Sequence, residues 1–242
     1  MKNMRRISLD GKDGLAAPAA EAGKDGIERI HKVEQAGLEL FPCPDSTPRG
    51  TVMICPGGGY SILAISHEGR DIAKFLNGCG YDAAVLLYRV SEGKNTRKMA
   101  LADAMAGLTL LQKRGGEFGL CTKQVGVMGF SAGAHLSARL AHETKTGAMP
   151  DFLVLVYPAY LEKDGSLLED VIPPDVPIFV YVAKNDPYCP SSLAYEKYCR
   201  EHDIKCSFHL AESGGHGFGL KNPLPEGVGD WTEKLAQFLE SL

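Results

Sequence analysis

The sequence QVGVMGFSAGAHLSARLA, residues 124–141, carries the strongest local signal for the fold class. It begins with an apolar run, turns at a glycine-flanked serine, and continues with apolar residues at helical spacing. We predict a buried strand over residues 124–129 and a helix over residues 132–143, joined by a tight turn. A strand that leads directly into a helix is typical of a parallel sheet covered by helices.

The same alternation of strand and helix continues through the rest of the chain. Further strands are predicted where short runs are apolar throughout, because such runs suit strands buried on both faces. Helices are predicted where apolar residues recur three or four positions apart. The strands cover residues 51–55, 82–88, 152–157, 178–183 and 205–211, with a less regular antiparallel edge strand over 33–41, and the helices cover 64–77, 96–114, 191–202 and 230–242. We therefore expect an α/β fold with a mostly parallel central sheet and helices on both faces.

The chain shows no internal repeat and no change of composition that would mark a second domain. Residues 1–28 are rich in Gly, Ala, Lys and Asp and show little periodicity, so we expect an irregular N-terminal lead-in. Residues 29–242 are interpreted as one domain. The segment 161–175 contains two prolines and is too short for a sizeable cap, which favours an open site that admits bulky or polymeric substrates.

Composition excludes several classes of function. The 242 residues are 44% apolar and carry a formal net charge of -4 without a large block of one sign, which argues against binding to nucleic acid. No apolar stretch approaches the length of a membrane span, and the basic residues at the N-terminus are not followed by an apolar run. We expect a cytoplasmic protein, with a secreted or periplasmic mature form as the alternative. The seven scattered cysteines lack a C-x-x-C pair, which favours reduced thiols.

Ser131 is the candidate nucleophile. It lies at the centre of Gly129–Gly133, which has the pattern G-x-S-x-G between the predicted strand and helix. This is the setting of a nucleophile elbow, in which the serine is on a strained turn and flanking side chains would collide with nearby backbone. The simpler alternative is an ordinary strand-to-helix turn with a capping serine.

A serine hydroxyl needs a base, and the base needs an acid to orient it. Asp186 follows the predicted strand over 178–183, at the end of a parallel strand where such sheets carry function. His216 lies in SGGHGFG, residues 213–219, after the last strand and before the final helix. The chain order of serine, acid and histidine matches a nucleophile-elbow hydrolase. We predict a catalytic triad of Ser131, His216 and Asp186.

Other titratable residues are weaker candidates. His135 lies one helical turn after the serine and is interpreted as structural. His67 lies near the start of the first long helix and has no third metal ligand at a useful spacing, so no metal is predicted. Asp170 and Asp175 precede a strand and would lie at the wrong end of the sheet.

Acyl transfer also needs donors for the developing oxyanion. The sequence PGGGY, residues 56–60, follows the first predicted parallel strand, and its glycines allow backbone N–H groups to approach a substrate oxygen. We expect the N–H groups of Gly58 or Gly59 to act with that of Ala132. A phosphate-binding loop is disfavoured because neither nucleotide-binding glycine pattern is complete, and no cofactor is predicted.

Three tyrosines are candidates for the rim of a substrate pocket, because each follows the carboxyl end of a predicted strand. They are Tyr60, Tyr157 and Tyr188. The alternative for each is ordinary packing in the core.

Several short motifs, ordered along residues 30–242, together resemble a known family. They are PGGGY at 56–60, HEG at 67–69, YRV at 88–90, GFSAG at 129–133 followed by His135 and Leu136, YP at 157–158, DP at 186–187 and GHGFG at 215–219. This pattern resembles the bacterial acetyl-xylan-esterase-like α/β hydrolases, which are often grouped with feruloyl and acetyl carbohydrate esterases. Ala134 departs from the pattern, since the family commonly has Gly there. This substitution slightly tightens the elbow helix.

The resemblance implies an α/β-hydrolase fold and a serine carboxylesterase that needs no cofactor. Its substrates would be O-acetyl or O-feruloyl groups on plant polysaccharides or their fragments, with no nucleic acid or membrane partner. Two alternatives remain open at this point. The same triad could serve a generic short-acyl carboxylesterase or a serine peptidase-like hydrolase, because a fold does not fix the substrate. The second alternative, from another functional class, is a carbohydrate-binding or scaffold protein with an inert site.

Overall fold

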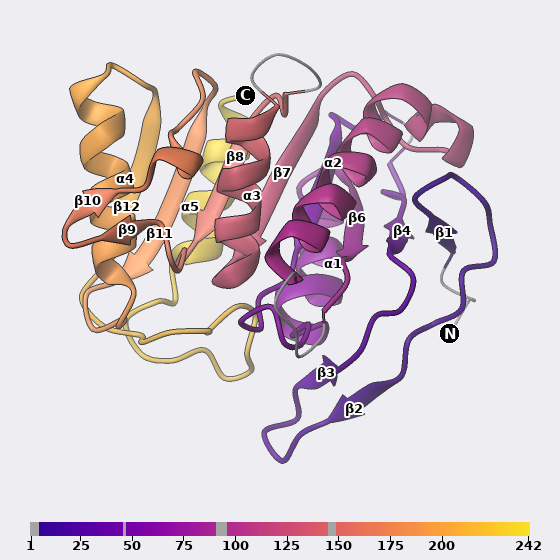
Figure 1. Cartoon of the computed structure of the whole chain (residues 1–242), viewed down its shortest axis with the longest axis horizontal. Helices are drawn as coiled ribbons and strands as arrows, with labels where there is room; N and C mark the ends of the chain where they lie inside the picture. Colours follow the sequence, from indigo (N-terminus) through magenta and orange to yellow (C-terminus); the bar gives the residue numbers. More distant parts are fainter. Residues whose placement is uncertain (1–4, 46, 91–95, 145–148) are drawn as a thin grey trace.

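The apolar strands form one eight-stranded sheet at the centre of the molecule (Figure 1). The computed structural model describes residues 5–45, 47–90, 96–144 and 149–242. Within these ranges the strands are β1 Arg6–Ser8, β2 Ala20–Ala22, β3 Glu28–Ile30, β4 Gly37–Phe41, β5 Thr51–Cys55, β6 Asp82–Leu87, β7 Val125–Phe130, β8 Leu153–Val156, β9 Glu162–Lys163, β10 Ser166–Leu167, β11 Ile178–Ala183 and β12 Cys206–Ala211. The helices are α1 Asp71–Gly78, α2 Thr96–Arg114, α3 Ala132–Glu143, α4 Cys189–Glu201 and α5 Trp231–Glu240, with a π-helical turn η1 Ser66–Arg70 and 3₁₀ turns η2 Gly115–Phe118 and η3 Glu169–Val171.

The strand order in this sheet is β1-β4-β6-β5-β7-β8-β11-β12. The six strands from β6 to β12 in this order run parallel, while β4 pairs antiparallel with β6 and β1 antiparallel with β4. The expected mostly parallel sheet is therefore confirmed. Because parallel strands share a direction, the loops after β5, β7, β11 and β12 all leave the same edge of the sheet.

Helices cover both faces of the sheet (Figure 1). Helices α2 and α3 pack against each other on one face. On the other face α1 and α5 meet through Phe75 and Trp231, whose ring centroids lie 6.5 Å apart. Every residue of β5, β6, β7, β8 and β11 is buried, as expected for strands covered on both sides.

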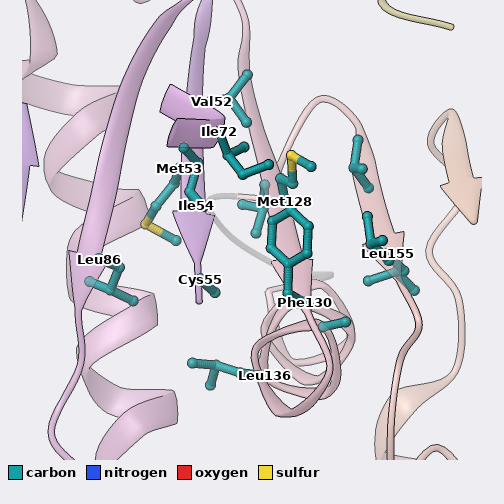
Figure 2. Packing of buried hydrophobic residues seen from close by; sticks show 14 of the residues in the cluster. Val52, Met53, Ile54, Cys55, Ile72, Leu86, Met128, Phe130, Leu136 and Leu155 are labelled. Atoms are coloured by element: carbon teal, nitrogen blue, oxygen red, sulfur yellow. The ribbon is translucent and has the colours of Figure 1, made fainter. Parts of the chain in front are cut away.

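The hydrophobic core lies between these layers, and Figure 2 shows its centre around β5 and β7. Ile54 and Met128 on these neighbouring strands are fully buried, as are Phe130 at the end of β7 and Leu136 on α3. The elbow serine follows Phe130 directly, so buried core residues support it.

The N-terminal segment differs from the sequence-based expectation of an irregular lead-in over residues 1–28. Residues 1–4 lie outside the described part of the chain, but Arg6–Ser8 forms β1 and adds an edge strand to the main sheet. Ile7 is fully buried there, and Arg6 pairs with Glu39 of β4. A three-residue strand is too short for a visible alternation of apolar and polar residues, so its sequence gave no periodic signal.

The region between β8 and β11 holds only the two-residue strands β9 and β10 and the turn η3, which agrees with the absence of a sizeable cap. None of the helices in the described ranges combines the length and the apolar composition needed to cross a bilayer. All seven cysteines lie within those ranges and are free thiols.

Candidate active site

Ser131 occupies a sharp turn between β7 and α3. Its φ of 52° lies in the left-handed region, which is strained for a residue with a side chain. The flanking glycines are required sterically: a Cβ on Gly129 would lie 2.3 Å from the carbonyl oxygen of Gly133, and one on Gly133 would lie 2.1 Å from that of Cys55. The geometry is that of a nucleophile elbow, which holds the serine at the carboxyl edge of the sheet.

The structure brings the three predicted triad residues together. Ser131 Oγ lies 2.7 Å from His216 Nε2, and His216 Nδ1 lies 2.8 Å from Asp186 Oδ2. The other carboxylate oxygen of Asp186 accepts a hydrogen bond from the backbone N–H of Tyr188 at 2.7 Å. The Asp186 side chain is fully buried, whereas that of His216 is 25% exposed. A carboxylate fixed in this way can hold the imidazole with Nδ1 protonated, which leaves Nε2 free to accept the serine proton.

The glycine loop after β5 lies beside the serine. Gly57 donates its backbone N–H to Glu68 Oε2 at 2.9 Å, so this group is not available to a substrate. The N–H groups of Gly58 and Gly59 donate to no other group in the described part of the chain. Both residues have positive φ, at 132° and 63°, a backbone conformation that favours glycine. These two N–H groups can therefore donate to a substrate oxygen.

Ala132 supplies the third N–H group near the serine. It is the first residue of α3, where backbone N–H groups have no intrahelical acceptor. The N-terminus of a helix also favours negative charge. This arrangement is suited to stabilising a developing oxyanion on an atom bonded to Ser131.

A cleft of about 340 Å³ opens directly over the serine. Tyr160 and Tyr188 lie on its wall, and their ring centroids are 5.2 Å apart. Arg29 and Lys221 contribute the positively charged side chains of the lining. The full lining is Ile27, Arg29, Gly58, Gly59, Ile62, Ala64, His67, Glu68, Ser131, Tyr160, Tyr188, His216, Gly217 and Lys221.

The structure corrects two of the three tyrosines expected at the pocket rim. Tyr60 is only 4% exposed and its hydroxyl lies 2.6 Å from His135 Nδ1. Tyr157 is fully buried, and its hydroxyl donates to Glu68 Oε1 at 2.8 Å. Both side chains have polar partners inside the protein, so their hydroxyl groups can be buried. Tyr188 does line the cleft, and its ring lies 5.0 Å from that of His216.

His135 has a structural environment, as the sequence suggested. Burial, together with the nearby positive charges of Arg97 and Arg139, lowers its pKa to about 4. Burial also raises the pKa of Tyr60, so the tyrosine keeps its proton and can donate it to the neutral imidazole. The rival carboxylate Asp170 forms an ion pair with Arg139 instead of approaching His216.

Sequence reasoning missed several residues of the cleft. Tyr160 follows β8 by a few residues and has a φ of 59°. Tyr157 was chosen because it follows the carboxyl end of a predicted strand, and the same rule, extended three residues further, would have found Tyr160. Arg29 and Lys221 carried no local signal, since each is brought to the cleft by the fold. Glu68 entered the sequence analysis only within the HEG motif at 67–69, without a role of its own, although its carboxylate is buried beside the glycine loop.

Comparison with known proteins agrees with the fold. Residues 52–171 match a family model described as the alpha/beta hydrolase fold. An acetylxylan esterase of Xylanibacter ruminicola is 25% identical over 227 residues, which is 79% of this chain and 47% of the relative. Endo-1,4-beta-xylanase B of Butyrivibrio fibrisolvens is also 25% identical, over 74% of this chain and 34% of the relative. The chain thus spans less than half of either curated relative.

A solved structure extends the likeness over the whole chain. The acetyl ester-xyloside bifunctional hydrolase from Caldicellulosiruptor lactoaceticus superposes with a TM-score of 0.76 at 24% identity, covering 98% of this chain and 95% of that one. This likeness concerns the fold. Together with the family match and the curated relatives, it shows that the chain has the α/β-hydrolase fold and is similar to acetylxylan-esterase-like proteins.

Proposed function

We propose that the chain is a serine carboxylesterase that hydrolyses O-acyl groups on carbohydrates derived from plant polysaccharides. The observation that carries the proposal is the continuous hydrogen-bond chain from Ser131 through His216 to Asp186, at the base of an open cleft. The name of the Xylanibacter relative supports an acetyl ester of xylan as substrate.

In this mechanism Ser131 Oγ attacks the ester carbonyl carbon while His216 Nε2 accepts the hydroxyl proton. Asp186 stabilises the resulting imidazolium through Nδ1–H. The negative charge on the former carbonyl oxygen is stabilised by the N–H groups of Gly58 or Gly59 and of Ala132.

The tetrahedral intermediate collapses when the bond between the carbonyl carbon and the sugar oxygen breaks. His216 gives its proton to that oxygen, so the sugar leaves as an alcohol and an acyl group stays on Ser131. A water molecule then attacks the acyl-enzyme, with His216 as its base, and the free carboxylic acid leaves. The serine regains its proton, so the cycle is closed without a cofactor.

The shape of the cleft supports a sugar ester over a small buried substrate. No sizeable cap covers it within the described ranges, so a sugar ring attached to the leaving oxygen can extend into solvent. Tyr160 and Tyr188 offer aromatic surface beside the serine. Such surface suits contact with a sugar ring or with the phenyl ring of a feruloyl group, which we propose as the larger alternative to acetyl.

The experiment compares hydrolysis of p-nitrophenyl acetate with release of acetic acid from acetylated xylo-oligosaccharides. Ser131→Ala should lower kcat on both substrates by about 10⁴-fold or more. Ser166→Ala, a change of an exposed serine on β10, is the matched control and should behave as the unaltered protein.

The outcomes separate the alternatives. Turnover of the activated ester alone would contradict the carbohydrate substrate and favour a generic short-acyl esterase. Comparable turnover of an amide such as a peptide p-nitroanilide would favour a peptidase-like hydrolase. If Ser131→Ala retained full activity, the assignment of the nucleophile would be wrong.

A further inference from the structure

Glu68 is a buried carboxylate that the mechanism above does not use. It lies in the π-helical turn η1, and the residue is 3% exposed. Single π-helical turns are frequent at functional sites. A buried carboxylate must be fully hydrogen-bonded to be tolerated, so its partners reveal what it holds in place.

The first partner of Glu68 is the glycine loop. Oε2 accepts the N–H of Gly57 at 2.9 Å. A Cβ on Gly57 would lie 2.6 Å from this oxygen and 3.0 Å from the Cβ of Ser131, so the loop is held between the carboxylate and the nucleophile. The Gly57 N–H is thus directed to Glu68, while the next two N–H groups of the loop donate to no acceptor among the described residues.

The second partner leads to the loop that carries His216. Glu68 Oε1 accepts the hydroxyl of Tyr157 at 2.8 Å, and the same hydroxyl accepts the N–H of Gly219 at 2.9 Å. Burial and the neighbouring Glu68 raise the pKa of Tyr157, so its hydroxyl stays protonated and can serve both bonds. The Tyr157 ring also lies 5.0 Å from the His216 ring.

We propose that Glu68 is a positioning residue for ester hydrolysis, which fixes the oxyanion-binding loop directly and the His216 loop through Tyr157. Hydrogen bonds to a carboxylate are stronger than neutral ones, so one side chain can hold both loops in the geometry that the transition state needs. The inference rests on the proposed esterase function, since it assigns Gly58 or Gly59 as the oxyanion donor.

Glu68→Gln is the direct test, because it keeps the size of the side chain but replaces one acceptor oxygen by a donor. If its oxygen accepts from Gly57, its NH₂ group faces Tyr157, whose hydroxyl proton then loses its acceptor. We expect kcat for p-nitrophenyl acetate to fall by roughly ten- to hundredfold, with KM changed by less than about threefold, since the lost interactions act in the transition state. Affinity for an alkylboronic acid, which forms a tetrahedral adduct with serine, should fall by a similar factor.

Asp82→Asn is the matched control. Asp82 is also a buried carboxylate with two hydrogen-bond partners, the N–H groups of Cys43 and Cys121 at 2.7 and 2.6 Å. It begins β6 and therefore lies at the opposite end of the sheet from the site. This change should lower the melting temperature but leave kcat and boronate affinity within about twofold of the unaltered protein.

A second variant keeps the inference testable if Glu68→Gln fails to fold. Tyr157→Phe removes the hydroxyl and with it the hydrogen bonds to Glu68 Oε1 and from Gly219, but keeps the bond between Glu68 and Gly57. It should lower kcat by a smaller factor, about three- to tenfold, again without a matching rise in KM. The inference is overturned if a folded Glu68→Gln protein, or Tyr157→Phe in its place, keeps its kcat. It is also overturned if Asp82→Asn loses as much kcat at equal loss of stability. Failure of the proposed function itself would be seen separately, as activity that survives Ser131→Ala.

Discussion

Protonation of His135 should make the fold sensitive to mild acid. The residue is 2% exposed, and its Nδ1 accepts the hydroxyl of Tyr60 at 2.6 Å, which requires a neutral ring. Its pKa is about 4 in the folded protein, compared with an ordinary value of 6.5. Between pH 6.5 and pH 4 the unfolded chain therefore binds a proton at this residue that the folded protein does not bind. The free energy of unfolding must fall as the pH falls from 6.5 to 4.

The magnitude follows from the width of this window. At about 1.4 kcal/mol per pH unit, the loss from this one group is about 3 kcal/mol. Stability from His135 is complete above pH 6.5 and is lost on the way down to pH 4. For a protein of ordinary stability, on the order of 10 kcal/mol, this is a substantial fraction.

His135→Asn isolates this contribution, because its amide oxygen is bonded to Cγ as Nδ1 is and can still accept from Tyr60, but the side chain cannot take up a proton. Urea unfolding at several pH values, followed through the fluorescence of the buried Trp231, gives the free energies. We expect the unaltered protein to lose about 3 kcal/mol more than the variant between pH 7 and pH 4. Contributions of the carboxylates cancel in this difference.

The control is His31→Asn, a change of an exposed histidine. Its difference from the unaltered protein should stay constant over the same pH range. A constant difference for His135→Asn as well would refute the reasoning, since the buried ring would then be protonated as easily in the folded state as in the unfolded chain.

Three further predictions concern the elbow, the cleft and the triad. Gly133→Ala should destabilise the protein by about 3 kcal/mol in urea unfolding, because its Cβ would lie 2.1 Å from the Cys55 carbonyl oxygen. The control is Gly116→Ala, which should have almost no effect because a Cβ there meets no neighbouring group within 4 Å. Tyr160→Leu should raise KM for aryl esters about fivefold and leave kcat unchanged in steady-state assays, and an unchanged KM would remove this tyrosine from substrate binding. Asp186→Asn should lower kcat by about 10⁴-fold in the p-nitrophenyl acetate assay, because the imidazole loses the partner that fixes its tautomer, and a fall below tenfold would contradict that role.

The parts of this protein that could be predicted are those with a local signal. The strand, glycine turn and helix around Ser131 occupy consecutive residues, and α2 and α3 have the bounds expected from their periodicity. Asp186 and His216 follow strands of the same parallel sheet, so their chain positions alone place them at one edge. Candidate residues for the triad could therefore be chosen from the sequence alone.

The remaining features depend on contacts between distant segments. Tyr157 follows a strand just as Tyr188 does, but only the fold decides that the former is buried against Glu68 while the latter lies on the cleft. The N-terminal β1 is recognisable only through its pairing with β4. In the same way, the partners of Glu68 come from residues 11 and 89 positions away, which no motif of the sequence connects.

The central claim is that Ser131 is a nucleophile activated by His216, and labelling by a fluorophosphonate tests it most directly. The account predicts a single covalent adduct, mapped by mass spectrometry to the peptide that contains Ser131, with labelling slowed by orders of magnitude in His216→Gln. No adduct, an adduct on another residue, or equal labelling of the His216 variant would contradict it.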